Sequence, residues 1–149
     1  LSVTITKKVV GDMGDTTKDF SFTATLDTTQ IRQGSAYTTA GDGAALTDTG
    51  FTLRSGGSVT LTHLRADQTL TLTETDPGDH TVSWQLNGDD GPTGVTCTLQ
   101  VPRAQPAEIT CINTRNVGIP TGLHTGAAPY LALVGLCWLG WRLLRRREV

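Results

Sequence analysis

The chain has 149 residues, a formal net charge of −2 at pH 7, 17 glycines and few aromatic residues. This length predicts one domain, and residues 1–118 are enough for a core of sandwich size. Residues 1–122 carry a net charge of −5, which argues against nucleic-acid binding because the phosphate backbone selects basic surfaces. An enzyme has little support, since the sequence contains no nucleophile elbow and no His/Cys cluster at metal-ligand spacing. His63 and His80 are expected to lie on the surface.

The first expected strand covers residues 3–9, where apolar and polar side chains alternate with the period of a β-strand. Val3, Ile5 and Val9 share one face with Lys7. A lysine on an apolar face is unusual, because a buried ammonium is costly unless it is paired or neutralised. Two interpretations stay open: Lys7 points into the core, or it lies on an edge strand and extends its ammonium outward.

Residues 11–15 predict a turn, and the next alternating strand spans 20–26. Asp12 and Asp15 are interpreted as turn residues, because two carboxylates fall far short of a calcium ligand set. No metal is therefore expected. Residues 28–49 contain little apolar sequence and predict a long connection with weak strands.

Short strands are expected at 51–53 and 59–61, with the second returning after a turn at 55–57. Residues 69–75 form a further alternating segment in which Leu70 and Leu72 share a face with Glu74. This acid is in phase with the core side of its strand. The alternative is that Glu74 lies at the rim, where a turn begins at Asp76.

A strand at 82–86 ends at Asn87-Gly88, a strong turn dipeptide. The last two strands, 97–101 and 107–113, are predicted to form a hairpin. A turn centred near Ala104 would place Cys97 opposite Cys111, either as a disulfide or as two buried thiols. Asn113 follows in the same phase as Cys111, which makes it the third polar residue on a core face. Altogether the pattern predicts an all-β sandwich of about seven to nine strands.

Lys7, Glu74 and Asn113 have a joint chemical interpretation. A neutral lysine amine can attack the asparagine carboxamide carbon and expel ammonia, leaving an amide bond. Burial favours the neutral form of both an amine and a carboxyl group. A protonated Glu74 would then hydrogen-bond the Asn113 carbonyl and move protons to the departing ammonia, while the fold supplies the proximity.

Four segments resemble the isopeptide-forming domains of Gram-positive backbone pilins and related wall-anchored adhesins. They are residues 1–13 (LSVTITKKVVGDM), 20–26 (FSFTATL), 70–76 (LTLTETD) and 109–115 (ITCINTR). The resemblance implies an Ig-like, CnaB/pilin-type sandwich over residues 1–116. It also implies a Lys7–Asn113 isopeptide bond catalysed by Glu74, with no cofactor. Lys8 and Asn116 are the neighbouring alternatives, and strand phase disfavours Lys8; Cys111 stands where a large aromatic is more typical.

The C-terminal region has a different character. A linker at 117–126 contains Ile119, Pro120, Thr121 and Gly122, followed by an apolar segment at 127–144 and a basic tail at 145–149. About 20 apolar residues span a bilayer as a helix, so 127–144 is a short candidate transmembrane segment. Its arginines predict a cytoplasmic end, which places residues 1–116 outside the cell.

The order of these parts resembles the cell-wall sorting signal of Gram-positive surface proteins. This implies that a sortase cuts between Thr121 and Gly122 and joins Thr121 to an amine. The alternative is an ordinary single-pass anchor. No signal peptide is visible, although an exported protein needs one, so the chain is expected to be the C-terminal piece of a longer precursor.

The predicted function is a wall-anchored stalk or pilin module, with sortase and either peptidoglycan or a neighbouring pilin subunit as partners. The rival is an adhesin domain that binds glycans or host matrix on the same fold. Exposed aromatic residues would favour the rival, but of eight aromatics only Tyr37 is expected to be available for stacking on a sugar. The stalk is therefore preferred.

Overall fold

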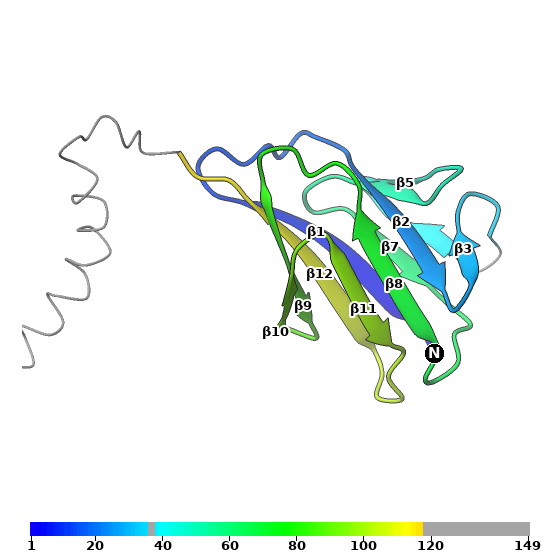
Figure 1. Cartoon of the computed structure of the whole chain (residues 1–149). Helices are drawn as coiled ribbons and strands as arrows, with labels where there is room; N and C mark the ends of the chain where they lie inside the picture. The colour runs from blue at the N-terminus through cyan, green and yellow to red at the C-terminus, as the bar shows by residue number, and fades with distance from the viewer. Residues whose placement is uncertain (36–37, 118–149) are drawn as a thin grey trace, which may run out of the picture. The chain divides into compact units, whose positions relative to one another are not determined.

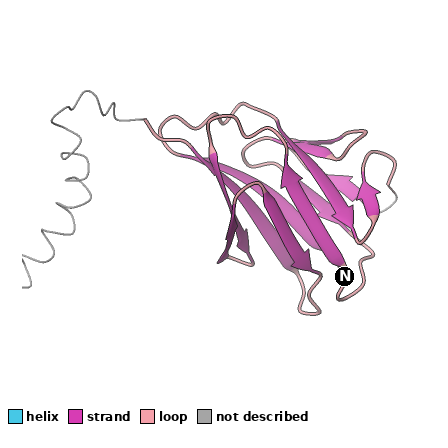
Figure 2. Cartoon of the chain, in the orientation of Figure 1, coloured by secondary structure: helices cyan, strands magenta, loops and turns pink. Residues whose placement is uncertain are grey.

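The computed structural model describes residues 1–35 and 38–117, and within these ranges the chain forms strands and loops without a helix (Figures 1 and 2). The predicted all-β sandwich is confirmed. Twelve strands occur in the described residues: β1 (Val3–Val10), β2 (Phe20–Leu26), β3 (Thr29–Ile31), β4 (Thr38–Ala40), β5 (Ala44–Leu46), β6 (Phe51–Leu53), β7 (Ser58–Leu61), β8 (Thr69–Glu74), β9 (Thr81–Leu86), β10 (Asp89–Thr93), β11 (Thr96–Gln100) and β12 (Ala107–Thr114).

The strands form two sheets. One has the order β10-β9-β12-β1-β7-β4, and the other has the order β11-β8-β2-β6-β5 with β3 paired to β2. The first and last strands, β1 and β12, are parallel neighbours near the middle of their sheet, in register from Val3 opposite Ala107 to Val10 opposite Thr114 (Figure 1). A parallel pair needs a long connection, and here nearly the whole domain lies between the two strands.

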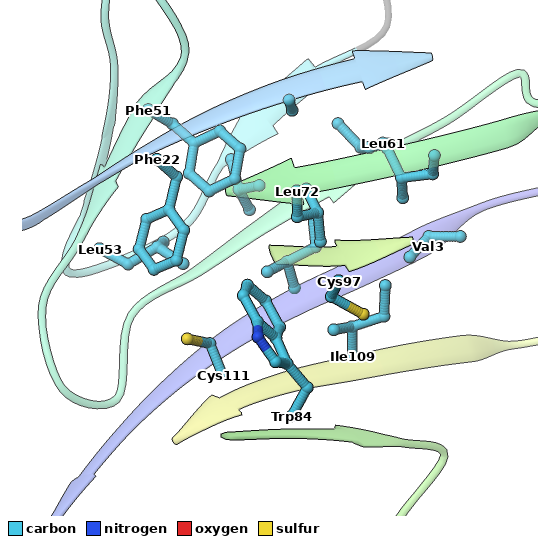
Figure 3. Packing of buried hydrophobic residues seen from close by; sticks show 14 of the residues in the cluster. Val3, Phe22, Phe51, Leu53, Leu61, Leu72, Trp84, Cys97, Ile109 and Cys111 are labelled. Carbon is cyan, nitrogen blue, oxygen red and sulfur yellow. The ribbon is translucent and has the colours of Figure 1, made fainter. Parts of the chain in front are cut away.

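The core lies between the sheets and follows from the alternation of each strand. In β1 and β12 every second side chain is buried, which matches the two-residue period of a pleated strand. Phe22 and Phe51 stack at a centroid distance of 5.3 Å, and Trp84 meets Phe22 edge-on at 6.3 Å (Figure 3). Each such fully buried side chain contributes about 1.5–3 kcal/mol of transfer free energy.

The predicted hairpin of the last two strands is wrong. β11 pairs with β8 in one sheet, whereas β12 pairs with β1 and β9 in the other. Cys97 and Cys111 therefore lie in opposite sheets, with Trp84 between them in Figure 3. Both are buried free thiols, so the disulfide considered from the sequence is not formed.

Two further differences concern the short strands. The second of the strands β6 and β7 was expected to return alongside the first after the turn at 55–57. The two strands belong to different sheets instead, because this turn crosses from one sheet to the other. The strand number exceeds the expected one because β3, β4 and β5, three residues each, form within the connection at 28–49, and β10 follows the turn at Asn87-Gly88. That turn is as predicted: both residues have positive φ, 51° and 85°.

The contacts divide the chain after Asn116, so that Leu1–Asn116 is one unit. In the described part of the chain, no helix has the length and apolar character to cross a bilayer. The predicted sorting motif, the apolar segment at 127–144 and the basic tail lie outside the described residues.

Candidate functional site

Three polar side chains are enclosed in the core of the sandwich. Lys7 and Glu74 are each 1% exposed, and Asn113 is 0% exposed. β1 and β12 carry Lys7 and Asn113 on the inner face of one sheet, and β8 brings Glu74 from the other. Lys7 therefore does not extend to solvent, and Glu74 does not lie at the rim.

One carboxylate joins the other two groups. Lys7 Nζ donates to Glu74 Oε1 at 2.5 Å, and Asn113 Nδ2 donates to Glu74 Oε2 at 2.8 Å. The amine and the carboxamide are thus held side by side on the two oxygens of one carboxyl group. The strand register allows this, because Lys7 is opposite Cys111 and one diagonal step from Asn113.

Aromatic rings cover the amine. Lys7 Nζ lies 4.3 Å from the centroid of the Phe20 ring and 5.4 Å from that of Phe22. The rings exclude water and stabilise a cation through their quadrupoles. A buried ion pair nevertheless rarely repays its desolvation, and apolar residues of similar size would serve stability as well or better. The group is therefore better explained by chemistry than by stability.

Cys111 belongs to the same cluster, which the sequence did not reveal. Its Sγ lies 3.4 Å from Lys7 Nζ, 3.7 Å from Asn113 Oδ1 and 3.9 Å from Glu74 Oε1. Burial raises the pKa of the Cys111 thiol to about 12, so that the thiol remains protonated at neutral pH. The available signal was its position two residues before Asn113 on the same strand face, but the sequence interpretation considered Cys111 only as half of a disulfide with Cys97 or as one of two buried thiols.

The orientation of the Asn113 carboxamide differs from expectation. Glu74 was expected to hydrogen-bond the carbonyl oxygen, but its Oε2 accepts from the amide nitrogen. The carbonyl oxygen faces the Cys111 thiol. Glu74 is thus placed beside the nitrogen that would leave as ammonia.

His80 was predicted to lie on the surface, and this is wrong. It is 9% exposed, its Nδ1 contacts Pro77 O at 2.9 Å, and its Nε2 accepts from the Asp15 backbone N–H at 3.2 Å. Its ring meets Phe20 edge-on at 5.3 Å. Both ring nitrogens have hydrogen-bonding partners, which allows the ring to be buried. Sequence periodicity in a loop cannot indicate this.

Asp15 makes the local hydrogen bonds of a turn residue, as predicted. Asp15 Oδ1 accepts hydrogen bonds from the Thr17 hydroxyl and backbone N–H, and these bonds lower the pKa of Asp15. Across residues 1–35 and 38–117, no three His, Cys, Asp or Glu side chains are grouped to hold a metal ion.

Comparisons with known proteins agree with this fold. The family model described as "Domain of unknown function (DUF7601)" matches residues 1–115. A pilin of Streptococcus pyogenes serotype M1 is 29% identical over 150 residues, which cover 89% of this chain and 44% of the relative. The chain therefore spans less than half the length of this curated relative.

Solved structures give the same picture. The crystal structure of the major pilin from Streptococcus pyogenes is similar with a TM-score of 0.56 and 25% identity, over 78% of this chain and 48% of that one. A pilus-presented adhesin has a TM-score of 0.56 at 23% identity, over 78% and 28% of the two chains. At 23% identity, the similarity between this chain and the adhesin shows a common fold and nothing further.

Proposed function

The chain belongs to the DUF7601 family. We propose that it is a structural module of a Gram-positive surface pilus or wall-anchored stalk, stiffened by an internal isopeptide bond. Its similarity to pilins supports a structural role rather than enzymatic turnover. The bond joins Lys7 to Asn113. The observation that carries this proposal is the single buried carboxylate of Glu74, which contacts both reacting groups.

The reaction begins when Lys7 transfers one proton to Glu74, leaving a neutral amine and a carboxylic acid. The amine lone pair attacks Asn113 Cγ, and the carbonyl electrons move to Oδ1. Glu74 then gives its proton to the Asn113 nitrogen and takes one from Lys7 Nζ. The C–N bond breaks, ammonia leaves and the carbonyl reforms. Glu74 ends as the neutral acid, so the step needs no cofactor, and the chemistry turns over once.

Proximity supplies much of the rate. The amine and the carboxamide are both hydrogen-bonded to the carboxyl group of Glu74, in a site closed to water by Phe20 and Phe22. Holding two reactants in this way replaces a bimolecular encounter in water by an intramolecular step.

The C-terminal region attaches the module. In this proposal a sortase recognises Ile119, Pro120, Thr121 and Gly122 and cuts after Thr121. The apolar segment 127–144 holds the precursor in the membrane until then, with tail 145–149 in the cytoplasm. The new Thr121 carboxyl is joined to peptidoglycan or to a neighbouring pilin subunit, which places the mature protein at the cell wall. The sequence pattern and the similarity to pilins support this.

Intact mass tests the bond. The 149-residue chain, produced in reducing buffer with mild detergent, should be lighter than its sequence mass by one ammonia. Glu74→Gln should retain its full mass, because an amide cannot shuttle the protons. Tandem mass spectrometry should identify Lys7 joined to Asn113.

Lys8→Ala is the matched control, because Lys8 is exposed on the same strand and should not affect the mass loss. A folded wild-type chain at full mass would refute the isopeptide proposal and leave an ordinary sandwich.

A further inference from the structure

The two polar atoms of the Asn113 side chain have different neighbours. Nδ2 donates to Glu74 Oε2 at 2.8 Å, and Oδ1 lies 3.7 Å from Cys111 Sγ. Among the described residues, the thiol is the group that donates to this oxygen. In the proposed reaction Oδ1 is the atom on which negative charge develops. The oxygen that most needs a hydrogen-bond donor therefore faces a thiol.

The thiol is set up to donate in this direction. Lys7 Nζ donates to Cys111 Sγ at 3.4 Å, so the sulfur accepts on that side and its own proton is available for another acceptor. Glu74 Oε1 is farther away, at 3.9 Å, and already accepts from Lys7. The raised pKa of Cys111 keeps the proton in place and makes a thiolate nucleophile unfavourable.

We propose that Cys111 is a further catalytic residue of the cross-linking reaction, whose S–H stabilises the oxyanion that forms on Asn113 Oδ1 when the Lys7 amine attacks. This rests on the proposed isopeptide function. The thiol keeps its proton throughout: the Lys7 nitrogen lone pair forms the new bond, the carbonyl electrons move to Oδ1 and return, and ammonia leaves. Glu74 transfers the protons, and Cys111 donates a hydrogen bond to the oxyanion.

The expected size of the effect follows from the donor. Removing one oxyanion donor typically slows a reaction about 10²–10³-fold. A thiol is a weak donor, so the expected loss in the rate of cross-linking is smaller than that range, about tenfold.

The rate is measurable during synthesis. The 149-residue chain is made in a reducing cell-free reaction with mild detergent, and samples are quenched in acid at intervals. Intact mass gives the fraction that has lost ammonia, and resistance to brief proteolysis in parallel samples gives the fraction folded. Relative to folding, Cys111→Ala should lose ammonia about tenfold more slowly than wild type, whereas Cys111→Ser, which restores an O–H donor, should recover most of the rate.

Cys97→Ala is the matched control for the loss of a buried thiol. Cys97 is 1% exposed and lies in the opposite sheet, so this variant should react at the wild-type rate. Equal rates for wild type and Cys111→Ala, or an equal slowing in Cys97→Ala or Cys111→Ser, would overturn the donor role. A wild type that keeps its full mass would overturn the isopeptide function together with it.

A nucleophilic role for Cys111 is separated by Lys7→Met. The donor role predicts that this variant keeps its full mass and that both buried thiols react with an alkylating agent after denaturation. Loss of ammonia together with loss of the Cys111 thiol would indicate a thioester instead, and would overturn the proposal.

Discussion

At the residue scale, the core contains a lysine where a sandwich of this size would ordinarily place an aliphatic side chain. Lys7 is among the largest fully buried side chains, together with Trp84 and the core phenylalanines. Its ammonium is satisfied by Glu74 and covered by Phe20. Such a pair gains little net stability over apolar packing. The cost makes physical sense if the proposed bond to Asn113 then removes the charge of Lys7 and leaves Glu74 neutral.

The thiol of Cys111 leads to a prediction about alkaline stability. Its pKa rises from an ordinary value of 9.0 to about 12 on folding, so between these pH values the folded state retains a proton that the unfolded chain releases. The free energy of unfolding should therefore fall as pH rises above 9, by about 1.4 kcal/mol per pH unit for this thiol. Below pH 9 the contribution is complete.

Denaturant unfolding between pH 8 and 10.5 measures this fall, in Glu74→Gln chains that carry no cross-link. The chain with Cys111 should lose stability more steeply than the chain with Cys111→Ala. Parallel pH profiles for the two chains would contradict the prediction.

At the element scale, two loops meet at one end of the sandwich. The loop between β1 and β2 contains Asp15, and the loop between β8 and β9 contains Pro77 and His80. The His80 ring joins them by hydrogen bonds to both and packs edge-on against Phe20, the residue that covers Lys7. This histidine therefore fixes the loop end next to the candidate site.

Replacing His80 by Asn tests that connection. His80→Asn removes an aromatic contact and two hydrogen-bonding positions in a buried place, so the free energy of unfolding should fall by about 2 kcal/mol. His63→Asn is the control, because His63 is exposed and has a φ of 59° that Asn tolerates; its effect should stay within about 0.5 kcal/mol. Equal effects in thermal or denaturant unfolding would show that His80 contributes no more than an exposed residue.

At the scale of the whole domain, the chain enters through β1 and leaves after β12, and these two strands are parallel neighbours. A bond between Lys7 and Asn113 would pass tension directly from one to the other. The enclosed loop would contain more than a hundred residues, and it would be protected from extension and slow to unfold.

Single-molecule pulling from the two ends of the chain measures this. The cross-linked wild type should show no unfolding step for residues 8–112, because the covalent bond bypasses them. Glu74→Gln, without the bond, should unfold in a step that adds on the order of 350 Å of contour length. A wild-type step of the same length would mean that the bond is not in the path of the force.

The sequence predicted the inner face of each long strand correctly, because a side-chain period of two allows only two phases. That rule put Lys7, Glu74 and Asn113 on the core-facing side of their strands, and the turn at Asn87-Gly88 followed from local chemistry. The burial in the structure then excluded an outward Lys7 and a rim position for Glu74. The rule says nothing about which strands pair, and the hairpin assumed for the last two strands was therefore wrong.

The sequence by itself thus determined the fold class, the phase of the strands and the three polar residues of the candidate site. Only the tertiary structure decided that Cys97 and Cys111 lie in opposite sheets, that Cys111 faces the Asn113 carbonyl, and that His80 is buried. The reason is physical: alternation is a local property of the backbone, whereas pairing, side-chain orientation and loop burial depend on contacts between residues far apart in the chain.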